Sequence, residues 1–220
     1  MIGVLGGTGP QGSGLALRWA AAGLRVVIGS RDAGRAENLA RELAERAGVA
    51  VDAVTGTDNA QCAARAGIVL VAVPWDGHDA LLTALRKPLA DKIVIDCVNP
   101  LGFDGRGPYP LGVEEGSAAQ RAAALLPDSR VVAAFHHVSA VILADLSITQ
   151  VDCDVLVLGD DRAAVDQVRT LADAIPGVRG VYGGRLRNAG QVEALTANLI
   201  AVNRRYRTHA GIRLTALPPP

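Results

Sequence analysis

Short apolar runs alternate with amphipathic segments along almost the whole chain. Runs of strand length lie at residues 2–6, 25–29, 50–55, 68–73, 92–97, 130–135, 153–158 and 178–182. Segments with helical spacing of apolar residues lie at 10–22, 32–47, 58–66, 77–86, 117–126, 161–174 and 188–209. Wholly apolar strands indicate a sheet that is buried on both faces. The alternation therefore predicts an α/β fold with a doubly wound parallel sheet and right-handed crossovers.

A glycine-rich turn follows the first predicted strand. Its sequence is Gly6-Gly7-Thr8-Gly9-Pro10-Gln11-Gly12, and its glycines fit two registers, Gly7-x-Gly9-x-x-Gly12 and Gly6-x-x-Gly9-x-x-Gly12. Such a turn at a helix N-terminus binds an anion through free backbone N–H groups and the helix dipole. Because the turn separates a strand from a helix, we predict that residues 7–12 bind a dinucleotide, with a purely structural turn as the alternative.

Two arginines and a serine after the second predicted strand indicate which dinucleotide is bound. Ser30 and Arg31 end that strand, and Arg35 lies one helical turn further on. An acidic residue there binds the ribose 2′-hydroxyl of NAD, whereas cations accept the 2′-phosphate of NADP. Arg31 and Arg35 can face one phosphate, which favours NADP by a few kcal/mol, at about 1.5–3 kcal/mol for each charged hydrogen bond. A solvated helix start is the alternative.

One stretch interrupts the alternation of strands and helices. Residues 98–116 are rich in glycine and proline and predict a long loop, which in a compact domain is usually functional or mobile. We expect residues 1–178 to form the dinucleotide-binding domain, a Rossmann fold. Residues 179–220 are then a small C-terminal helical unit.

Composition and charge exclude several classes of function. The chain has 22 basic and 22 acidic residues, so no general attraction to nucleic acid or to a membrane is expected. Cys62, Cys97 and Cys153 lack CxxC or CxxH spacing, and the last two lie in apolar runs that predict buried thiols. No signal peptide or apolar run of bilayer length is visible. We expect a cytoplasmic location and no metal site.

Three further segments end predicted strands at the edge where doubly wound sheets bind ligands. Val73-Pro74-Trp75 ends the fourth strand and is expected beside the cofactor crevice, although a strand terminator with a rim tryptophan is equally compatible. Asn99-Pro100 follows the fifth strand. His136-His137 ends another, and because adjacent residues on an extended segment point to opposite faces, we expect one histidine to face the site and the other the protein interior. Structural histidines are the alternative.

The chain lacks the tyrosine and lysine pair with which short-chain dehydrogenases donate a proton. Tyr109, Tyr182 and Tyr206 have no lysine four residues later. Reduction of a carbonyl requires a general acid, whereas a hydride exchanged between two carbon-centred redox rings requires only stacked and aligned rings. The missing pair therefore favours transfer from cofactor to cofactor.

Together, these motifs resemble those of the NADPH:coenzyme F420 oxidoreductases. The similar segments are Gly-Gly-Thr-Gly-x-x-Gly at 6–12, Val-Ile-Gly-Ser-Arg at 27–31, Val-Pro-Trp at 73–75, Phe-His-His-Val-Ser-Ala at 135–140, Gly-Asp-Asp at 159–161 and Leu-Arg-Asn-Ala at 186–189. The resemblance covers nearly the whole chain. It implies reversible hydride transfer between NADP(H) and the deazaflavin coenzyme F420.

The resemblance also implies roles for particular residues. Thr8 to Gln11 are expected to contact the pyrophosphate, and Ser30, Arg31 and Arg35 the 2′-phosphate. Val73, Trp75 and Ala140 are expected beside the nicotinamide. His136, Val138 and the C-terminal helix are expected beside the deazaflavin. His136 would orient the deazaflavin or stabilise its anionic pyrimidine edge. Archaeal members of the family are expected to have Thr-Ile-Pro after the first histidine, where this chain has His137-Val138-Ser139.

Two other functions stay open at the level of the sequence. One is an NADPH-dependent reductase of a small imine or carbonyl compound, with His136 or His137 as the general acid. The other is a non-enzymatic NADP-sensing module. Under the favoured interpretation the partners are small-molecule cofactors, and the C-terminal helical unit covers a neighbour's site, which predicts a homodimer.

Overall fold

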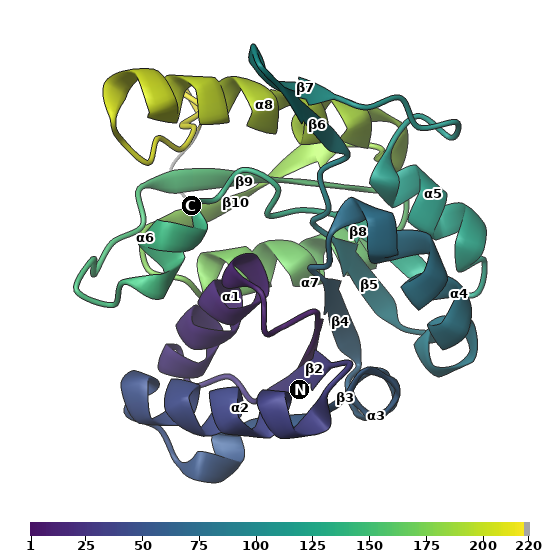
Figure 1. The fold of residues 1–220 in the computed structure, drawn as a ribbon, viewed down its shortest axis with the longest axis vertical. Helices are drawn as coiled ribbons and strands as arrows, with labels where there is room; N and C mark the ends of the chain where they lie inside the picture. Colours follow the sequence, from purple (N-terminus) through teal and green to yellow (C-terminus); the bar gives the residue numbers. More distant parts are fainter. Residues whose placement is uncertain (218–220) are drawn as a thin grey trace.

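The fold is an eight-stranded sheet with helices on both faces, and a separate hairpin lies beside it (Figure 1). The computed structural model describes residues 1–217. The strand order in the sheet is β10-β9-β8-β5-β4-β1-β2-β3. These strands are β1 (Ile2–Leu5), β2 (Val26–Ser30), β3 (Val54–Asp58), β4 (Ile68–Val71), β5 (Ile93–Asp96), β8 (Arg130–Ala133), β9 (Cys153–Gly159) and β10 (Val178–Gly184). The predicted α/β fold is therefore confirmed.

Eight α-helices cover the sheet within the described residues. They are α1 (Pro10–Ala21), α2 (Ala33–Ala47), α3 (Asn59–Arg65), α4 (His78–Leu89), α5 (Ala118–Leu125), α6 (Ala140–Ala144), α7 (Arg162–Asp173) and α8 (Ala189–Tyr206). One buried cluster joins the sheet to α1, α2 and α7, and a second joins it to α3, α4 and α5. Among residues 1–217, no helix has the length and apolarity to cross a membrane.

The sheet departs from the prediction at one junction. β8 and β9 are antiparallel, whereas every other neighbouring pair in this sheet is parallel. Between them, residues 134–152 contain only the short helix α6. A parallel neighbour requires a crossover that passes across the sheet, whereas here α6 packs on α1 and the chain turns back into an antiparallel neighbour. The sheet is thus mostly parallel, with β9 and β10 reversed.

Two local predictions were wrong. The third strand was expected at residues 50–55, but a 3₁₀ turn, η1 (Val51–Ala53), delays it to Val54–Asp58. The expected loop at 98–116 contains a hairpin of β6 (Leu101–Asp104) and β7 (Gly107–Pro110). Its turn is closed by Asp104, whose Oδ1 accepts from the N–H groups of Arg106 and Gly107 at 2.8 and 3.1 Å.

The expected division of the chain at residue 178 stays a prediction. β10 begins there and pairs with β9, so this strand belongs to the large sheet. Beyond it, the 3₁₀ turn η3 (Leu186–Asn188) leads into α8, and the β6–β7 hairpin lies against α8 (Figure 1). The last three residues of the expected unit lie outside the described part of the chain.

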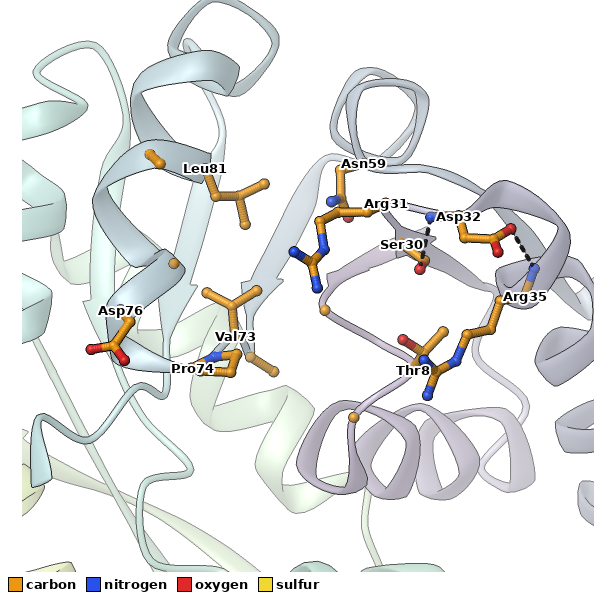
Figure 2. A pocket seen from close by; sticks show the side chains of 15 residues that line it. Thr8, Ser30, Arg31, Asp32, Arg35, Asn59, Val73, Pro74, Asp76 and Leu81 are labelled. Atoms are coloured by element: carbon orange, nitrogen blue, oxygen red, sulfur yellow. Dashed lines mark hydrogen bonds between the residues drawn. The ribbon is translucent and has the colours of Figure 1, made fainter. Parts of the chain in front are cut away.

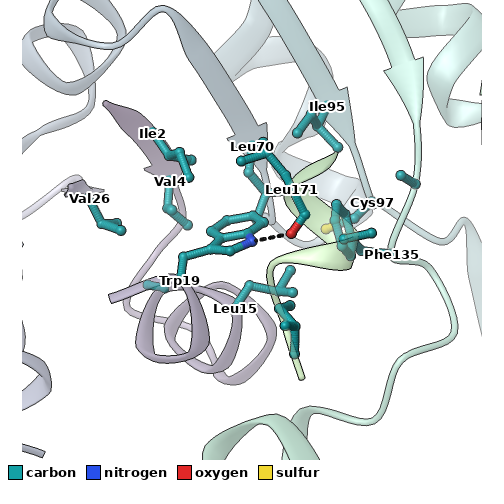
Figure 3. Close-up of a cluster of buried hydrophobic side chains, with 14 of the residues drawn as sticks. Ile2, Val4, Leu15, Trp19, Val26, Leu70, Ile95, Cys97, Phe135 and Leu171 are labelled. Atoms are coloured by element: carbon teal, nitrogen blue, oxygen red, sulfur yellow. Dashed lines mark hydrogen bonds between the residues drawn. The ribbon is translucent and has the colours of Figure 1, made fainter. Parts of the chain in front are cut away.

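The core joins α1 to the far half of the sheet. Trp19 of α1 is fully buried, and its indole N–H donates to the carbonyl of Leu171 in α7 at 3.0 Å. Its ring meets Phe135 edge to face, with centroids 5.6 Å apart (Figure 3). Cys97 and Cys153 are buried and unpaired within the described residues, as predicted, and Cys62 shares this state.

A buried arginine fixes α6 on α1. The guanidinium of Arg18 donates to the carbonyls of Leu143, Ile148, Ile142 and Asp145 at 2.6–2.9 Å. These groups lie in and just after α6, where helix carbonyls lack partners in their own helix. A Cβ at Gly14 would lie 2.8 Å from that of Leu143, so only glycine permits this close approach. The side chain of Arg18 therefore holds residues 142–148, in the segment after β8, in place.

We expect Arg18→Met to lower the free energy of unfolding by about 2–4 kcal/mol, because buried carbonyls lose their donor. Urea unfolding monitored by circular dichroism measures this change. Arg46→Met is the matched control, because Arg46 also donates to a carbonyl near α6, that of Ala144 at 2.6 Å, from an exposed position. The control should change stability by less than about 1 kcal/mol. Equal losses in the two variants would contradict the assigned role.

Candidate cofactor site

A cavity of about 890 Å³ opens at the carboxyl ends of β1, β2 and β4 (Figure 2). The residues that line it are Gly6, Thr8, Gly9, Ser30, Arg31, Asp32, Arg35, Asn59, Ala72, Val73, Pro74, Asp76, Gly77, Ala80 and Leu81. β1 has β2 on one side and β4 on the other, so the chain reverses its direction of winding here. Open α/β sheets bind ligands at such a switch point. The structure therefore brings the predicted glycine turn, cations and β4 terminus to one cavity.

Steric constraints shape the turn between β1 and α1. Gly6 has φ +71°, and a Cβ there would lie 2.6 Å from the carbonyl oxygen of Ala72. A Cβ at Gly7 would lie 2.8 Å from the oxygen of Val4, and one at Gly12 would lie 2.9 Å from the Cα of Gly7. Only glycine fits such contacts. Gly6, Gly7 and Gly12 are thus required by sterics, whereas a Cβ at Gly9, the glycine shared by both registers, would lie 3.3 Å from the oxygen of Gly6.

The same turn leaves the N-terminus of α1 open. Gly9 is the N-cap and has no side chain to cap the helix, and Pro10 follows at the first helical position. The first N–H groups of a helix have no partner within the helix, and the helix dipole adds positive potential there. This end of α1 can hold a phosphate. The cradle fits the pyrophosphate of a dinucleotide.

The second wall of the cavity carries two arginines. Arg31 and Arg35 are exposed, both line the cavity, and Figure 2 shows Arg31 extending toward its middle. Within residues 1–217, neither guanidinium forms an ion pair. Two unpaired cations on one wall suit a ligand with a phosphate.

An aspartate between these arginines is engaged by the protein. Asp32 is the N-cap of α2, and its Oδ1 accepts from the N–H of Arg35 at 3.1 Å. Its own N–H donates to Oγ of Ser30 at 3.2 Å. Because this carboxylate caps α2, it is less available for the ribose hydroxyl that an acidic residue binds in NAD enzymes.

The third wall comes from the segment after β4. Val73 and Pro74 line the cavity, as the sequence suggested, but Trp75 does not. Trp75 begins the 3₁₀ turn η2 (Trp75–Gly77), and its ring lies 5.2 Å from that of His78, tilted by 36°. Sequence reasoning did not single out Asn59, Asp76, Gly77, Ala80 or Leu81. The signal available for them was their position after β3 and β4, at the same sheet edge.

The turn after β8 brings together three distant segments. Phe135 has φ +66°, a left-handed conformation that is rare for a large side chain. Its carbonyl accepts from Nε2 of Gln11 in α1 at 3.1 Å. The carbonyl of His136 accepts from Nδ2 of Asn99 at 2.9 Å and from Oγ1 of Thr196 in α8 at 3.2 Å. Donors from α1, α8 and the end of β5 thus hold the strained turn.

Both histidines of this turn are buried, and the expectation that one of them faces the site stays a prediction. His136 is 4% exposed and His137 5%, and neither lines the cavity. Burial lowers the pKa of each to about 4. Nδ1 of His137 lies 3.9 Å from Sγ of Cys153, and within the described residues neither ring nitrogen of His136 has a hydrogen-bond partner. Neutral imidazoles are poor general acids near pH 7, which weakens the carbonyl reductase alternative.

Comparisons with known proteins identify one family, and the relatives found match nearly the whole chain. A family model described as NADP oxidoreductase, coenzyme F420-dependent, matches residues 1–100. The F420-dependent NADP reductase of Methanothermobacter thermautotrophicus is 43% identical over 99% of this chain and 95% of that protein. The chain belongs to this family. The reductase of Methanocaldococcus jannaschii, another member, is 37% identical over 98% of each chain.

Solved structures agree with the membership in the F420-dependent NADP reductase family. A proposed F420-dependent NADP reductase from Arthrobacter sp. FB24 has a TM-score of 0.79 at 29% identity, over 94% of this chain and 95% of that one. An imine reductase from Streptomyces aurantiacus has a TM-score of 0.60 at 21% identity, over 93% of this chain and 61% of that one. The second likeness shows the shared fold alone.

Within this family member, the predicted site residues fall into two groups. Those on the cavity are Thr8, Gly9, Ser30, Arg31, Arg35, Val73 and Pro74. Those off it are Gly7, Pro10, Gln11, Gly12, Trp75, His136, Val138 and Ala140. Several of the second group shape the turn or the adjoining segment after β8, and their contacts with a ligand stay predictions. Across residues 1–217, no cluster of three or more potential metal ligands forms.

Proposed function

We propose that this protein transfers a hydride reversibly between NADP(H) and coenzyme F420. Relatives that match the chain over nearly its full length are named F420-dependent NADP reductases, so the family implies NADP and coenzyme F420 as the two cofactors. The observation that carries the proposal is the cavity, where an open helix N-terminus and two unpaired cations lie at one sheet edge. When bound, one cofactor supplies the hydride and the other accepts it.

The cavity suggests how the protein holds NADP(H). The N–H groups at the start of α1, within residues 7–12, receive the pyrophosphate. Ser30, Arg31 and Arg35 receive the 2′-phosphate, because guanidinium groups match the geometry of phosphate oxygens. Val73 and Pro74 line the cavity on the side proposed for the nicotinamide half. Trp75 follows them in the chain, and its ring lies against that of His78.

The turn after β8 is proposed to border the second ring. Val138 is buried, and Ala140 begins α6, which Arg18 holds against α1. His136 precedes them in the turn that Gln11 also supports. Because hydride transfer between two rings needs alignment and not a proton donor, a neutral His136 fits an orienting role. Its ring nitrogens must turn outward to reach a ligand, since both are buried.

We expect the double variant Arg31→Ala/Arg35→Ala to lower kcat/KM for NADPH by at least about 100-fold and to leave kcat/KM for NADH nearly unchanged. The reason is the loss of two charge-assisted contacts with the 2′-phosphate, at about 1.5–3 kcal/mol each. The absorbance of F420 in mixtures with NADPH or NADH measures both values. Arg41→Ala is the control. Arg41 is exposed, lies in α2 like Arg35, and does not line the cavity. Failure of the unaltered protein to reduce F420 with NADPH would refute the function itself.

His136→Asn is expected to reduce kcat for F420 reduction by about 10- to 100-fold while the Kd for NADPH stays the same, because misalignment of reacting rings slows transfer. Stopped-flow absorbance at saturating NADPH gives the rate, and a fluorescence titration gives the Kd. His209→Asn changes an exposed histidine after α8 and serves as the control. An unchanged rate would remove His136 from the mechanism.

We further propose a homodimer in the cytoplasm. Large apolar side chains are exposed on two elements in contact with each other, the β6–β7 hairpin (Phe103, Tyr109) and α8 (Val202, Tyr206). Exposed apolar groups that lie on neighbouring elements mark an interaction surface. The proposed C-terminal unit, residues 179–220, would supply much of this interface. Three free cysteines without a disulfide fit a reducing compartment.

The double variant Phe103→Asp/Tyr206→Asp should convert the dimer to a monomer, because it places two charges in an apolar contact. Sedimentation velocity at micromolar concentration measures the mass. Val51→Asp is the control, because the side chain of Val51 is 67% exposed, close to the 68% of Phe103. Val51 lies in η1 before β3, at the opposite edge of the sheet from β10. An unaltered protein that is monomeric, or a variant that stays dimeric, would contradict the proposed interface.

A further inference from the structure

A buried histidine that the sequence analysis did not single out joins the cavity wall to the sheet. His78 is the first residue of α4 and is 0% exposed. Its Nε2 lies 2.7 Å from Oδ2 of Asp96, the last residue of β5, which is also 0% exposed. Its Nδ1 lies 3.2 Å from Oδ1 of Asp79. Each ring nitrogen therefore faces a carboxylate.

These contacts favour the charged form of the ring. A carboxylate only accepts hydrogen bonds, and a neutral imidazole has a single N–H, so only the imidazolium donates to both partners. Burial by itself lowers the pKa of His78, but the hydrogen bonds to Asp96 and Asp79 outweigh it and raise the pKa above its usual value. The contacts of His78 with Asp96 and Asp79 thus favour the imidazolium form of the buried ring.

Other charged groups lie around His78 and its two acidic partners. On α5, Arg121 pairs with Asp79 at 2.8 Å, and it also pairs with Glu115 at 2.5 Å. From α8, the carboxylate of Glu193 accepts from the N–H groups of Ala118 and Ala119 at 2.9 and 3.1 Å. Burial raises the pKa of Glu193 to about 7. The acids in this region therefore come from α4, β5, the segment before α5 and α8.

The residues on either side of His78 form one wall of the cavity. Pro74, Asp76 and Gly77 precede it, and Ala80 and Leu81 follow. Neither η2 nor α4 has a side-chain cap at its N-terminus. The bond from His78 to Asp96 is therefore a side-chain tie between this wall and strand β5.

We propose that His78 is a positioning residue for NADP(H), which through its bond to Asp96 holds the wall at residues 74–81 against β5. This inference rests on the proposed placement of NADP(H) in the cavity. His78 does not touch the cavity itself, so it acts through the backbone of the wall. Loss of the tie lets the wall shift and weakens nucleotide binding, while the alignment of the rings depends on the turn after β8.

His78→Gln is expected to weaken NADPH binding and raise its KM about tenfold, with kcat at saturating NADPH within about twofold of the unaltered protein. Calorimetry gives the Kd, and F420 absorbance gives KM and kcat. His209→Gln is the matched control at an exposed position. A merely structural role predicts a lower melting temperature without this split between KM and kcat.

The indole next to His78 supplies an independent readout. Trp75 is one of two tryptophans, its ring is 5.2 Å from that of His78, and an imidazolium quenches indole emission more than a neutral imidazole does. Emission should rise as pH passes the raised pKa of His78. NADPH affinity should fall over the same range, because the bond to Asp96 weakens when the ring loses its positive charge. His78→Gln and Trp75→Phe should abolish the change in emission.

Asp79→Asn covers the case in which His78→Gln fails to fold. It removes one acid beside the ring from a side chain that is 45% exposed, and it should shift the midpoint of the emission change to lower pH. An unchanged midpoint, or an unchanged Kd for NADPH in a folded His78→Gln variant, overturns the inference. If the Arg31 and Arg35 variants also bind NADPH normally, the placement of the nucleotide has failed instead.

Discussion

The close approach of backbone segments at the turn between β1 and α1 is the constraint on which the rest of the structure depends. A side chain at Gly6 or Gly12 would collide with neighbouring backbone. Without those glycines α1 could not begin directly at the sheet edge with its N–H groups open. The same placement allows Trp19 to reach α7 and Arg18 to reach α6. One steric condition therefore sets both the anion cradle and the packing of the segment after β8.

The two halves of the proposed site differ in their electrostatics. The adenosine half presents exposed, unpaired guanidinium groups, which suit a doubly charged phosphate in contact with solvent. The half near the turn after β8 is buried, and its histidines are neutral because burial lowers their pKa. This division agrees with a reaction that binds a charged nucleotide but moves a hydride between rings in a place with little water.

The sequence predicted most strands because each is a largely apolar run, and such runs are buried wherever the sheet forms. It misplaced β3, because the start of that strand is decided by the turn at Val51–Ala53 and by pairing with β2. It missed the β6–β7 hairpin, since glycine and proline indicate turns without showing which residues pair. Ser30, Arg31 and Arg35 were found because they follow a strand with a known ligand edge. Leu81 and Asn59 were not, because only packing brings α4 and α3 to the cavity.

By itself, the sequence determined the alternation of strands and helices, the glycine turn and the cations that suit NADP. These depend on local sterics, periodicity and charge, which are properties of neighbouring residues in the chain. Only the tertiary structure decided that β9 runs antiparallel to β8, that both His136 and His137 are buried, and that His78 meets Asp96. Burial and partnership between residues far apart depend on how the layers pack, and no local pattern carries that information.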